Sequence, residues 1–332
     1  MASLVLDLRQ TIIEEALRNA ALQEALLDQL EDGIYVVDRE RRILFWNSAA
    51  ERISGYMEHE VTGQFCQNGL LMHCDADGRI LCGERCPLAA VMHDGVPREC
   101  EVFLRHREGH RVPVQVRSRP LYDPHGVTIG AVEIFREAAA LTGGGVRSPQ
   151  AFGCWDQTTG AATREYGEMR FWQAMDAFEK FEIPLGWLRI SLECAEGLEQ
   201  RCGQDGVTSA LKKIAATLSH NVGSFDVVTR WSETEFRIEA HGCSWPELAG
   251  MARKLVALAE TSSVVFYDSR FPLRISVAAA MAERGDTLQS LEARLSELFV
   301  NRQSGDNCLP LADRLFNLPE TRRIRERLIK LS

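Results

Sequence analysis

The sequence has no long apolar run and no excess of positive charge. None of its hydrophobic stretches approaches the roughly 20 residues of a membrane-spanning helix, and the start of the chain lacks the layout of a signal peptide. Its 38 Lys and Arg residues stand against 47 Asp and Glu residues, for a net charge of -9. This balance argues against nucleic acid as the main partner. We therefore expect a cytoplasmic protein with no membrane span and no nucleic-acid partner.

Cysteine, by contrast, is plentiful. The chain has ten cysteines, and five of them fall between Cys66 and Cys100. In a small secreted domain such a number would indicate a disulfide framework, but in a cytosolic chain of 332 residues it indicates thiols or metal ligation. A hydrophobic content of 45% with 26% charged residues is enough to bury real cores, and the length predicts two domains.

Residues 1–31 precede the first domain and have a helical pattern. Between residues 3 and 31, apolar side chains recur every seven residues, at Leu6, Ile13, Ala20 and Leu27. Such a stripe must be covered, either by the domain that follows or by the same helix of a second chain. We interpret residues 1–31 as a dimerisation helix and expect a homodimer.

Residues 32–137 form the first predicted domain. Two short strands, 33–38 and 43–47, are followed by helical patterns and then by three strands over 99–109, 110–119 and 127–135. This order, with Asn47-Ser-Ala-Ala-Glu-Arg-Ile-Ser-Gly-Tyr56, resembles PAS domains. The resemblance implies a sensory module with a five-stranded antiparallel sheet and flanking helices. The histidines beside its turns are predicted to be solvated turn residues rather than ligands: His106, His110 and His125.

The middle of this domain holds a dense group of soft metal ligands: Cys66, His73, Cys74, Cys82 and Cys86. The spacing Cys66-x6-His73-x8-Cys82-x3-Cys86 would close a four-ligand site, with Cys74 as the alternative to His73. Pro87 follows Cys86, and proline suits the first turn of a helix. Cys86 would then lie at a helix N-terminus, where a thiolate is favoured. We predict a zinc ion or an iron-sulfur cluster here. The alternative is a set of free thiols packed as small hydrophobic groups.

Residues 138–152 contain three consecutive glycines followed by Ser-Pro, which predicts a flexible linker. The second domain, 153–309, opens with Asp156-Gln-Thr-Thr-Gly160 and Arg164. It continues with a helix over 166–180, a strand over 184–193, and a hairpin over 226–240 whose tip follows Arg230-Trp231. These motifs resemble the GGDEF family, the diguanylate cyclases that condense two GTP molecules into cyclic di-GMP. The resemblance implies a nucleotidyl-cyclase fold, so that the chain as a whole is of the α+β or α/β class with two domains.

The same resemblance implies which positions carry the chemistry, and this chain departs from the family at most of them. Metal-binding carboxylates belong at Ser191 and Thr234, and strand alternation predicts that Glu235 points away from the side of Thr234. The resemblance also implies two positions that read guanine, two that form the hairpin tip and two that hold the triphosphate. In this chain they are, in that order, Glu199 and Gln200, Ser232 and Glu233, and Arg302 and Asp306. Phosphoryl transfer depends on positioned metals and cations. We therefore expect no catalysis and no use of Mg²⁺ and GTP.

Residues 310–332 predict a basic C-terminal helix that begins near Pro319. The sequence as a whole indicates a signalling protein in which a PAS sensor regulates an inactive GGDEF-like unit, which acts as an output or docking domain for an unknown protein partner. One alternative is an active diguanylate cyclase with unorthodox ligands. Another is a PAS domain that serves purely as a dimerisation scaffold.

Overall fold

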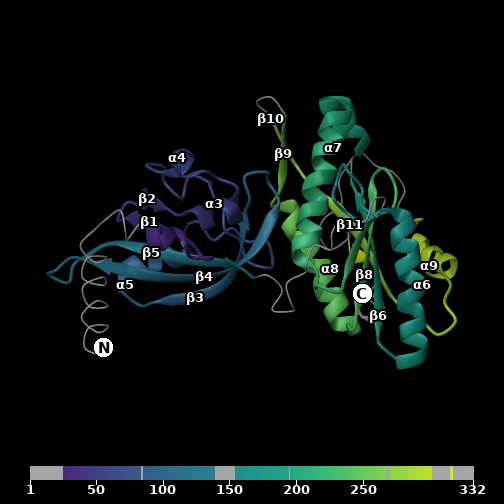
Figure 1. The fold of residues 1–332 in the computed structure, drawn as a ribbon. Helices are drawn as coiled ribbons and strands as arrows, with labels where there is room; N and C mark the ends of the chain where they lie inside the picture. The colour runs from purple at the N-terminus through teal and green to yellow at the C-terminus, as the bar shows by residue number, and fades with distance from the viewer. Residues whose placement is uncertain are drawn as a thin grey trace, which may run out of the picture. The chain divides into compact units, whose positions relative to one another are not determined.

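The computed structural model describes residues 25–83, 85–138, 154–193, 195–266, 269–300 and 315–316. The predicted dimerisation helix up to residue 24, the linker from 139 onward, Arg302, Asp306 and nearly all of the C-terminal segment lie outside these residues. The chain divides into two compact units (Figure 1). The first is built from residues up to 138 and the second from those after, except that 74–79 and 108–113 group with the second.

The first unit has a five-stranded sheet with the order β2-β1-β5-β4-β3. Its strands are β1 (Gly33–Asp38), β2 (Ile43–Trp46), β3 (Arg98–Arg105), β4 (Arg111–Tyr122) and β5 (Thr128–Glu137). The pairs β1–β2, β1–β5 and β4–β5 are antiparallel. This confirms the strands predicted from alternation, and the central position of β5 puts its inward side chains over the middle of the sheet.

Short helices connect β2 to β3: α3 (Ser48–Ser54), α4 (Glu58–Val61) and α5 (Pro87–Asp94). Asn47 begins α3, because its side chain accepts a hydrogen bond from the amide of Ala50. Gly55 ends α3 with φ 76°, a left-handed conformation that glycine adopts at no steric cost. Pro87 is the first residue of α5 and Cys86 is its N-cap, as predicted from the sequence.

The second unit has a sheet with the order β12-β11-β6-β8-β7 and a separate ribbon of β9 and β10. Its strands are β6 (Leu185–Leu192), β7 (Val227–Arg230), β8 (Glu235–His241), β9 (Ser263–Phe266), β10 (Ser269–Pro272), β11 (Ile275–Met281) and β12 (Leu315–Phe316). The predicted hairpin is confirmed, since β7 and β8 pair antiparallel on either side of the tip. Strand β12 pairs parallel with β11, and the basic helix predicted from Pro319 onward lies outside the described residues.

Two cores cover the two faces of this sheet. Helices α7 (Ala195–Asn221) and α8 (Trp245–Glu260) pack on the face that carries Leu188 and Ile190. Helices α6 (Arg164–Phe181) and α9 (Leu288–Val300) pack on the opposite face, against Trp187 (Figure 1). None of the described helices has the length and apolar character needed to cross a membrane.

Candidate functional site

A small cavity in the first unit is lined by four of the residues that the sequence predicts as metal ligands. Cys66, His73, Cys82 and Cys86 all line it, whereas Cys74 does not. The remaining lining residues are Tyr35, Arg41, Gln67, Leu71 and Glu133. Of the two alternatives for the fourth ligand, His73 therefore lines the same cavity as the three thiols, and Cys74 does not.

The loops that carry these residues are held by their own backbone. The amide of Cys66 donates to the carbonyl oxygen of Arg41 at 3.0 Å, which fixes the loop after α4 to the β1–β2 turn. The amide of His73 donates to Sγ of Cys82 at 3.2 Å, and the amide of Leu81 returns a bond to the carbonyl of His73 at 2.8 Å. Local pairing thus brings Cys82 beside His73, and the start of α5 sets the place of Cys86.

Glu133, on β5, adds a buried carboxylate that the sequence analysis missed. It is 2% exposed, accepts a hydrogen bond from the hydroxyl of Tyr35 at 2.7 Å, and accepts another from Ser118 at 3.1 Å. Its Oε1 lies 3.9 Å from Nε2 of His73. The sequence does hold a signal for it, because Glu133 is an acidic residue at an inward-facing position between the apolar residues Ala131 and Phe135 of the same strand.

The cavity is small, with a free volume of about 10 Å³. That is roughly the space of a single water-sized sphere. An organic cofactor of the size of a flavin or a haem has no room there. The cavity suits one ion or one water molecule, and an iron-sulfur cluster would require it to widen.

The ligand atoms lining the cavity are spread apart rather than gathered. Among the described residues, groups of three His, Cys, Asp or Glu ligand atoms come within 4.8 Å of one another only in the turn at residues 106–110, so the thiols stand further apart. Burial, followed by the charge of Glu133, raises the pKa of the Cys66 thiol, and the guanidinium of Arg41 opposes that rise. Cys66 is therefore a neutral thiol at pH 7. A cation bound here would have to displace its proton and draw the ligands together.

The donors nevertheless match a single transition-metal ion. Three thiols, an imidazole and a carboxylate are the ligand types that Zn²⁺ takes. Arg41 also lines the cavity, and its Nη1 is buried with no hydrogen-bond partner among the described residues. A guanidinium donor beside the thiols favours their anionic form, which is the form that binds a metal.

In the second unit, the structure brings together the two positions where the cyclase resemblance expects metal-binding carboxylates. Ser191, on β6, is paired with Glu235 of β8 and with Ser276 of β11. The amide of Leu192 donates to the carbonyl oxygen of Thr234 at 3.0 Å, so the hairpin tip lies beside the end of β6. The other predicted positions among the described residues are exposed: Glu199, Gln200, Ser232 and Glu233.

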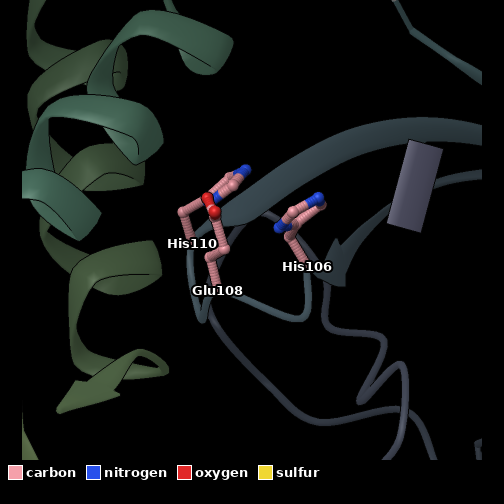
Figure 2. A group of neighbouring side chains, drawn as sticks. All are labelled: His106, Glu108 and His110. Carbon is pink, nitrogen blue, oxygen red and sulfur yellow. The ribbon is translucent and has the colours of Figure 1, made fainter. Parts of the chain in front are cut away.

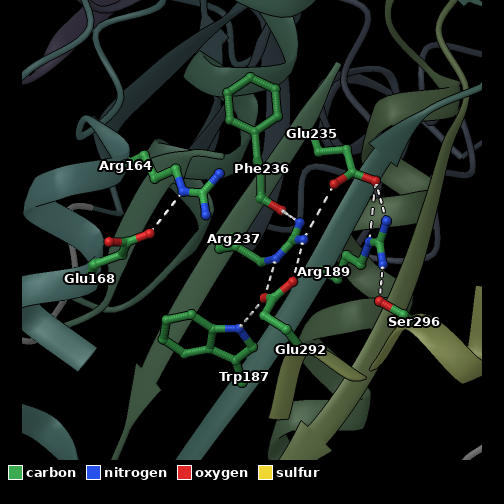
Figure 3. A network of polar contacts seen from close by, with 9 residues as sticks. All are labelled: Arg164, Glu168, Trp187, Arg189, Glu235, Phe236, Arg237, Glu292 and Ser296. Atoms are coloured by element: carbon green, nitrogen blue, oxygen red, sulfur yellow. Dashed lines mark hydrogen bonds and ion pairs between the residues drawn. The ribbon is translucent and has the colours of Figure 1, made fainter. Parts of the chain in front are cut away.

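Glu235 is the carboxylate nearest to Ser191 in the strand register, and it is held by two guanidinium groups. Arg189 donates to its Oε1 from Nε at 3.1 Å and from Nη2 at 2.6 Å (Figure 3). Arg237 donates to its Oε2 at 3.3 Å. The sequence predicted that Glu235 points away from the side of Thr234, and the strand register adds that it points to the side of Ser191. Because Ser191 and Glu235 are cross-strand partners, their side chains share one face of the sheet.

The same network continues to helix α9. Arg237, whose side chain is 2% exposed, donates to both oxygens of Glu292 at 2.6 and 2.7 Å, and Trp187 Nε1 donates to Glu292 at 3.2 Å (Figure 3). Burial acts to raise the pKa of Glu292, but the hydrogen bonds and charge of Arg237 outweigh it and hold the pKa below its usual value. Arg189 also donates to Ser296 at 2.7 Å. Arg189, Glu235, Arg237 and Glu292 thus satisfy one another.

The structure agrees with the prediction of solvated histidines for one residue and differs for another. His125 is exposed in the turn between β4 and β5, as expected. His110 is instead buried, and its ring lies near His106 and Glu108 in the turn between β3 and β4 (Figure 2). The expectation of a solvated turn residue was therefore wrong for His110, because its ring stacks on the ring of His220 in α7, with the two centroids 5.1 Å apart.

Comparisons with known proteins agree with the fold of the first unit. Residues 27–142 match the family model described as the PAS fold. A PAS domain from Colwellia psychrerythraea is 23% identical, with 36% of this chain and 97% of that chain covered and a TM-score of 0.31. No curated protein matches the chain.

Two other solved structures are similar to this chain. A sensory box/GGDEF family protein from Caulobacter crescentus is 20% identical, with 45% of this chain and 96% of that chain covered and a TM-score of 0.42. The diguanylate cyclase SiaD from Pseudomonas aeruginosa, solved in complex with its activator SiaC, is 15% identical, with 44% of this chain covered and a TM-score of 0.43. This chain spans 56% of the length of that SiaD chain. The chain thus has a PAS fold, which is followed by a second unit with a five-stranded sheet between helices.

Proposed function

We propose that the chain is a signalling protein in which the state of the thiol-lined PAS cavity controls a non-catalytic GGDEF-like unit. The observation that supports the proposal is the ion pair between Arg189 and Glu235. It lies beside Ser191, one of the two positions where the GGDEF resemblance implies a metal-binding carboxylate. A Mg²⁺ ion keeps several waters and depends on one or two protein carboxylates. Ser191 and Thr234 supply hydroxyl groups instead.

The remaining carboxylate is not available to a cation. To bind a metal, Glu235 would have to leave the guanidinium of Arg189, which is 2.6 Å away. A doubly charged ion about 4 Å from that guanidinium would meet a repulsion on the order of several kcal/mol at the effective dielectric of a protein surface. Catalysis of phosphoryl transfer depends on positioned metals and cations. Hydroxyl groups in place of the carboxylates, and a Glu235 held by Arg189, therefore remove the metal on which that catalysis depends.

The test of inactivity is incubation of the full chain with GTP and either Mg²⁺ or Mn²⁺. We expect no cyclic dinucleotide above the level of a heat-killed control. Formation of cyclic di-GMP at a rate well above that control would contradict the proposal and support the alternative of an active cyclase with unorthodox ligands.

The sensor part of the proposal concerns one ion in the PAS cavity. We propose that Cys66, Cys82 and Cys86, with His73, bind a zinc or iron ion, and that loss of the ion or oxidation of the thiols changes the order of the loops. Support comes from the donor set and from a cavity the size of one ion. In the chemistry of such a site, metal binding releases protons from the thiols and ties loops to the helix that follows.

Single substitutions test this assignment. Cys82→Ser and Cys86→Ser should each lower the metal content and increase amide hydrogen exchange over residues 66–93. Cys243→Ser, a thiol of the second unit, and Cys74→Ser, a thiol outside the cavity lining, should do neither. Equal metal content in all four variants would contradict the assignment. It would favour the alternative of a PAS domain that serves only as a dimerisation scaffold.

The proposed role of the second unit is to bind a protein partner, and the proposed assembly is a homodimer formed through residues 1–31. The support for dimerisation is the seven-residue apolar repeat of that segment. Light scattering of the full chain and of a chain lacking residues 1–24 tests it. We expect a dimer that dissociates on truncation, and a monomer in both cases would contradict the proposal.

A further inference from the structure

The turn between β3 and β4 carries three side chains that converge outside the PAS cavity. His106, Glu108 and His110 come from five consecutive positions, and their ligand atoms all lie within 4.8 Å of one another (Figure 2). Nδ1 of His110 is 4.0 Å from a carboxylate oxygen of Glu108. Since all three residues belong to one short hairpin turn, local backbone geometry sets their arrangement.

Two glycines help to hold this turn in shape. Gly109 has φ 95°, a conformation that other residues rarely adopt, and it reverses the chain between Glu108 and His110. The ring of His106 rests on Gly55 at the end of α3, where an added Cβ would lie 2.4 Å from Nε2 of His106. A hydrogen bond of 2.8 Å from the amide of Arg107 to the carbonyl of Ser54 anchors the turn at the same place.

We propose that His106, Glu108 and His110 bind one divalent transition-metal ion. Two imidazoles and one carboxylate are donors that Zn²⁺, Ni²⁺ and Cu²⁺ accept, whereas Ca²⁺ and Mg²⁺ require oxygen ligands almost throughout. Water would complete the coordination, because three protein ligands leave a position open. The ion is therefore exchangeable with solution.

The geometry requires only a small adjustment to close around the ion. With bonds of about 2.1 Å, tetrahedral ligand atoms stand roughly 3.4 Å apart. The present separations are 4.8 Å at most, so each must shorten by no more than about 1.4 Å. Glu108 can supply part of this movement, since its side chain is 76% exposed and can adopt another rotamer.

The site is distinct from the thiol cavity in residues and in donor chemistry. Its ligands are nitrogen and oxygen only, so Co²⁺ bound there lacks the sulfur-to-metal charge transfer that a thiolate site produces. The inference also does not depend on the proposed function, because a failure of either site leaves the other untouched. A chain carrying Cys82→Ser and Cys86→Ser separates the two experimentally.

The test is calorimetric titration of metal-free full-length chain with Zn²⁺, carried out in the Cys82→Ser, Cys86→Ser background. We expect one binding event, weakened at least about tenfold by His106→Ala or His110→Ala, since the loss of even a residue that only supports a metal ligand costs roughly tenfold or more in affinity. His125→Ala is the matched control, because His125 is an exposed histidine in the next turn along the chain, between β4 and β5. This variant should bind Zn²⁺ as the background does.

Glu108→Gln keeps the shape of an exposed side chain and removes its charge, so it tests the site even if a histidine variant fails to fold. It should weaken binding while leaving the circular dichroism spectrum unchanged. Equal Zn²⁺ affinity in the background, the histidine variants and Glu108→Gln would overturn the proposal. So would the absence of any binding event in the background, or sulfur-to-cobalt charge transfer there on addition of Co²⁺.

Discussion

Arg237 is the residue on which the ion-pair network of the second unit depends most. Its side chain is 2% exposed, it holds both oxygens of Glu292, and it donates to Glu235. Replacement by methionine, Arg237→Met, keeps an unbranched chain of similar length in contact with the ring of Trp231, over which the guanidinium lies. The change removes the charge and leaves Glu292 with Trp187 Nε1 as its remaining partner in the network.

The cost follows from the burial of the groups left behind. Removing one partner of a fully buried ion pair costs about 3–5 kcal/mol. Glu235 and Glu292 retain 17% and 21% side-chain exposure, and Arg189 still neutralises Glu235, so solvent screening lowers the cost. We expect Arg237→Met to reduce the free energy of unfolding of the second unit by about 2–4 kcal/mol.

The effect should depend on pH in a defined direction. In the native chain the pKa of Glu292 is held below its usual value, so its pairing stabilises the fold above the unfolded-state pKa and is lost as the pH falls through the folded-state pKa. Without Arg237, burial dominates and the pKa of Glu292 rises above its usual value. The difference between native and variant chains should therefore be largest at pH 7. It should shrink as the pH falls from the raised pKa of Glu292 in the variant to its lowered pKa in the native chain.

The assay is native-state hydrogen exchange of peptides that cover β8, measured at pH 7 in increasing urea, with denaturation followed at lower pH by fluorescence. Local exchange is preferable because a chain of two units need not unfold in one step. The control is Arg284→Met, whose partner Glu182 is 78% exposed and whose ion pair should contribute nothing measurable. If Arg237→Met and Arg284→Met exchange at the same rate, the network does not stabilise the sheet and the reasoning is refuted.

Three further predictions concern the two sites and the PAS sheet. The double variant Ser191→Asp, Thr234→Asp should still make no cyclic di-GMP in the turnover assay, because the new carboxylates would pair with the guanidinium groups already present. Robust synthesis by this variant would show that those guanidinium groups do not prevent catalysis. Gly130→Ala should destabilise the first unit by roughly 1–3 kcal/mol or more in thermal unfolding, since its Cβ would lie 2.1 Å from a backbone oxygen; an unchanged melting temperature would contradict the packing. Glu133→Gln should weaken metal retention about tenfold in equilibrium dialysis, and Glu137→Gln, exposed on the same strand, should not.

Periodicity alone predicted the elements that frame both sites. The hairpin of β7 and β8, the helix that became α6, and the start of α5 at Pro87 followed from alternation, helical spacing and proline placement. Each of these depends on residues that are neighbours in sequence. Element boundaries shifted by up to four residues: β3 ends at Arg105 where the pattern gave 109, and α6 spans Arg164–Phe181 where the pattern gave 166–180.

The contacts that give the sites their chemistry were beyond the reach of such patterns. Tyr35 and Glu133 are 98 residues apart, and Arg189 and Glu235 are 46 residues apart, so their pairing depends on which strands become neighbours. Alternation assigns a side chain to one of two faces, but strand register decides what it meets there. For that reason the sequence pointed to the thiols and to Ser191 and Thr234 as candidate positions, but it missed Glu133 and the guanidinium groups around Glu235.

The metal content of the full chain, purified without oxygen, tests most directly the claim that the PAS cavity is a sensor site. The account predicts about one zinc or iron ion per chain by elemental analysis after removal of ions from the β3–β4 turn with a weak chelator. It also predicts sulfur ligation by X-ray absorption, which should be lost in Cys86→Ser and retained in Cys243→Ser. Protein that carries no stoichiometric metal and shows no sulfur-to-metal charge transfer would contradict the claim and return these cysteines to the role of packed thiols.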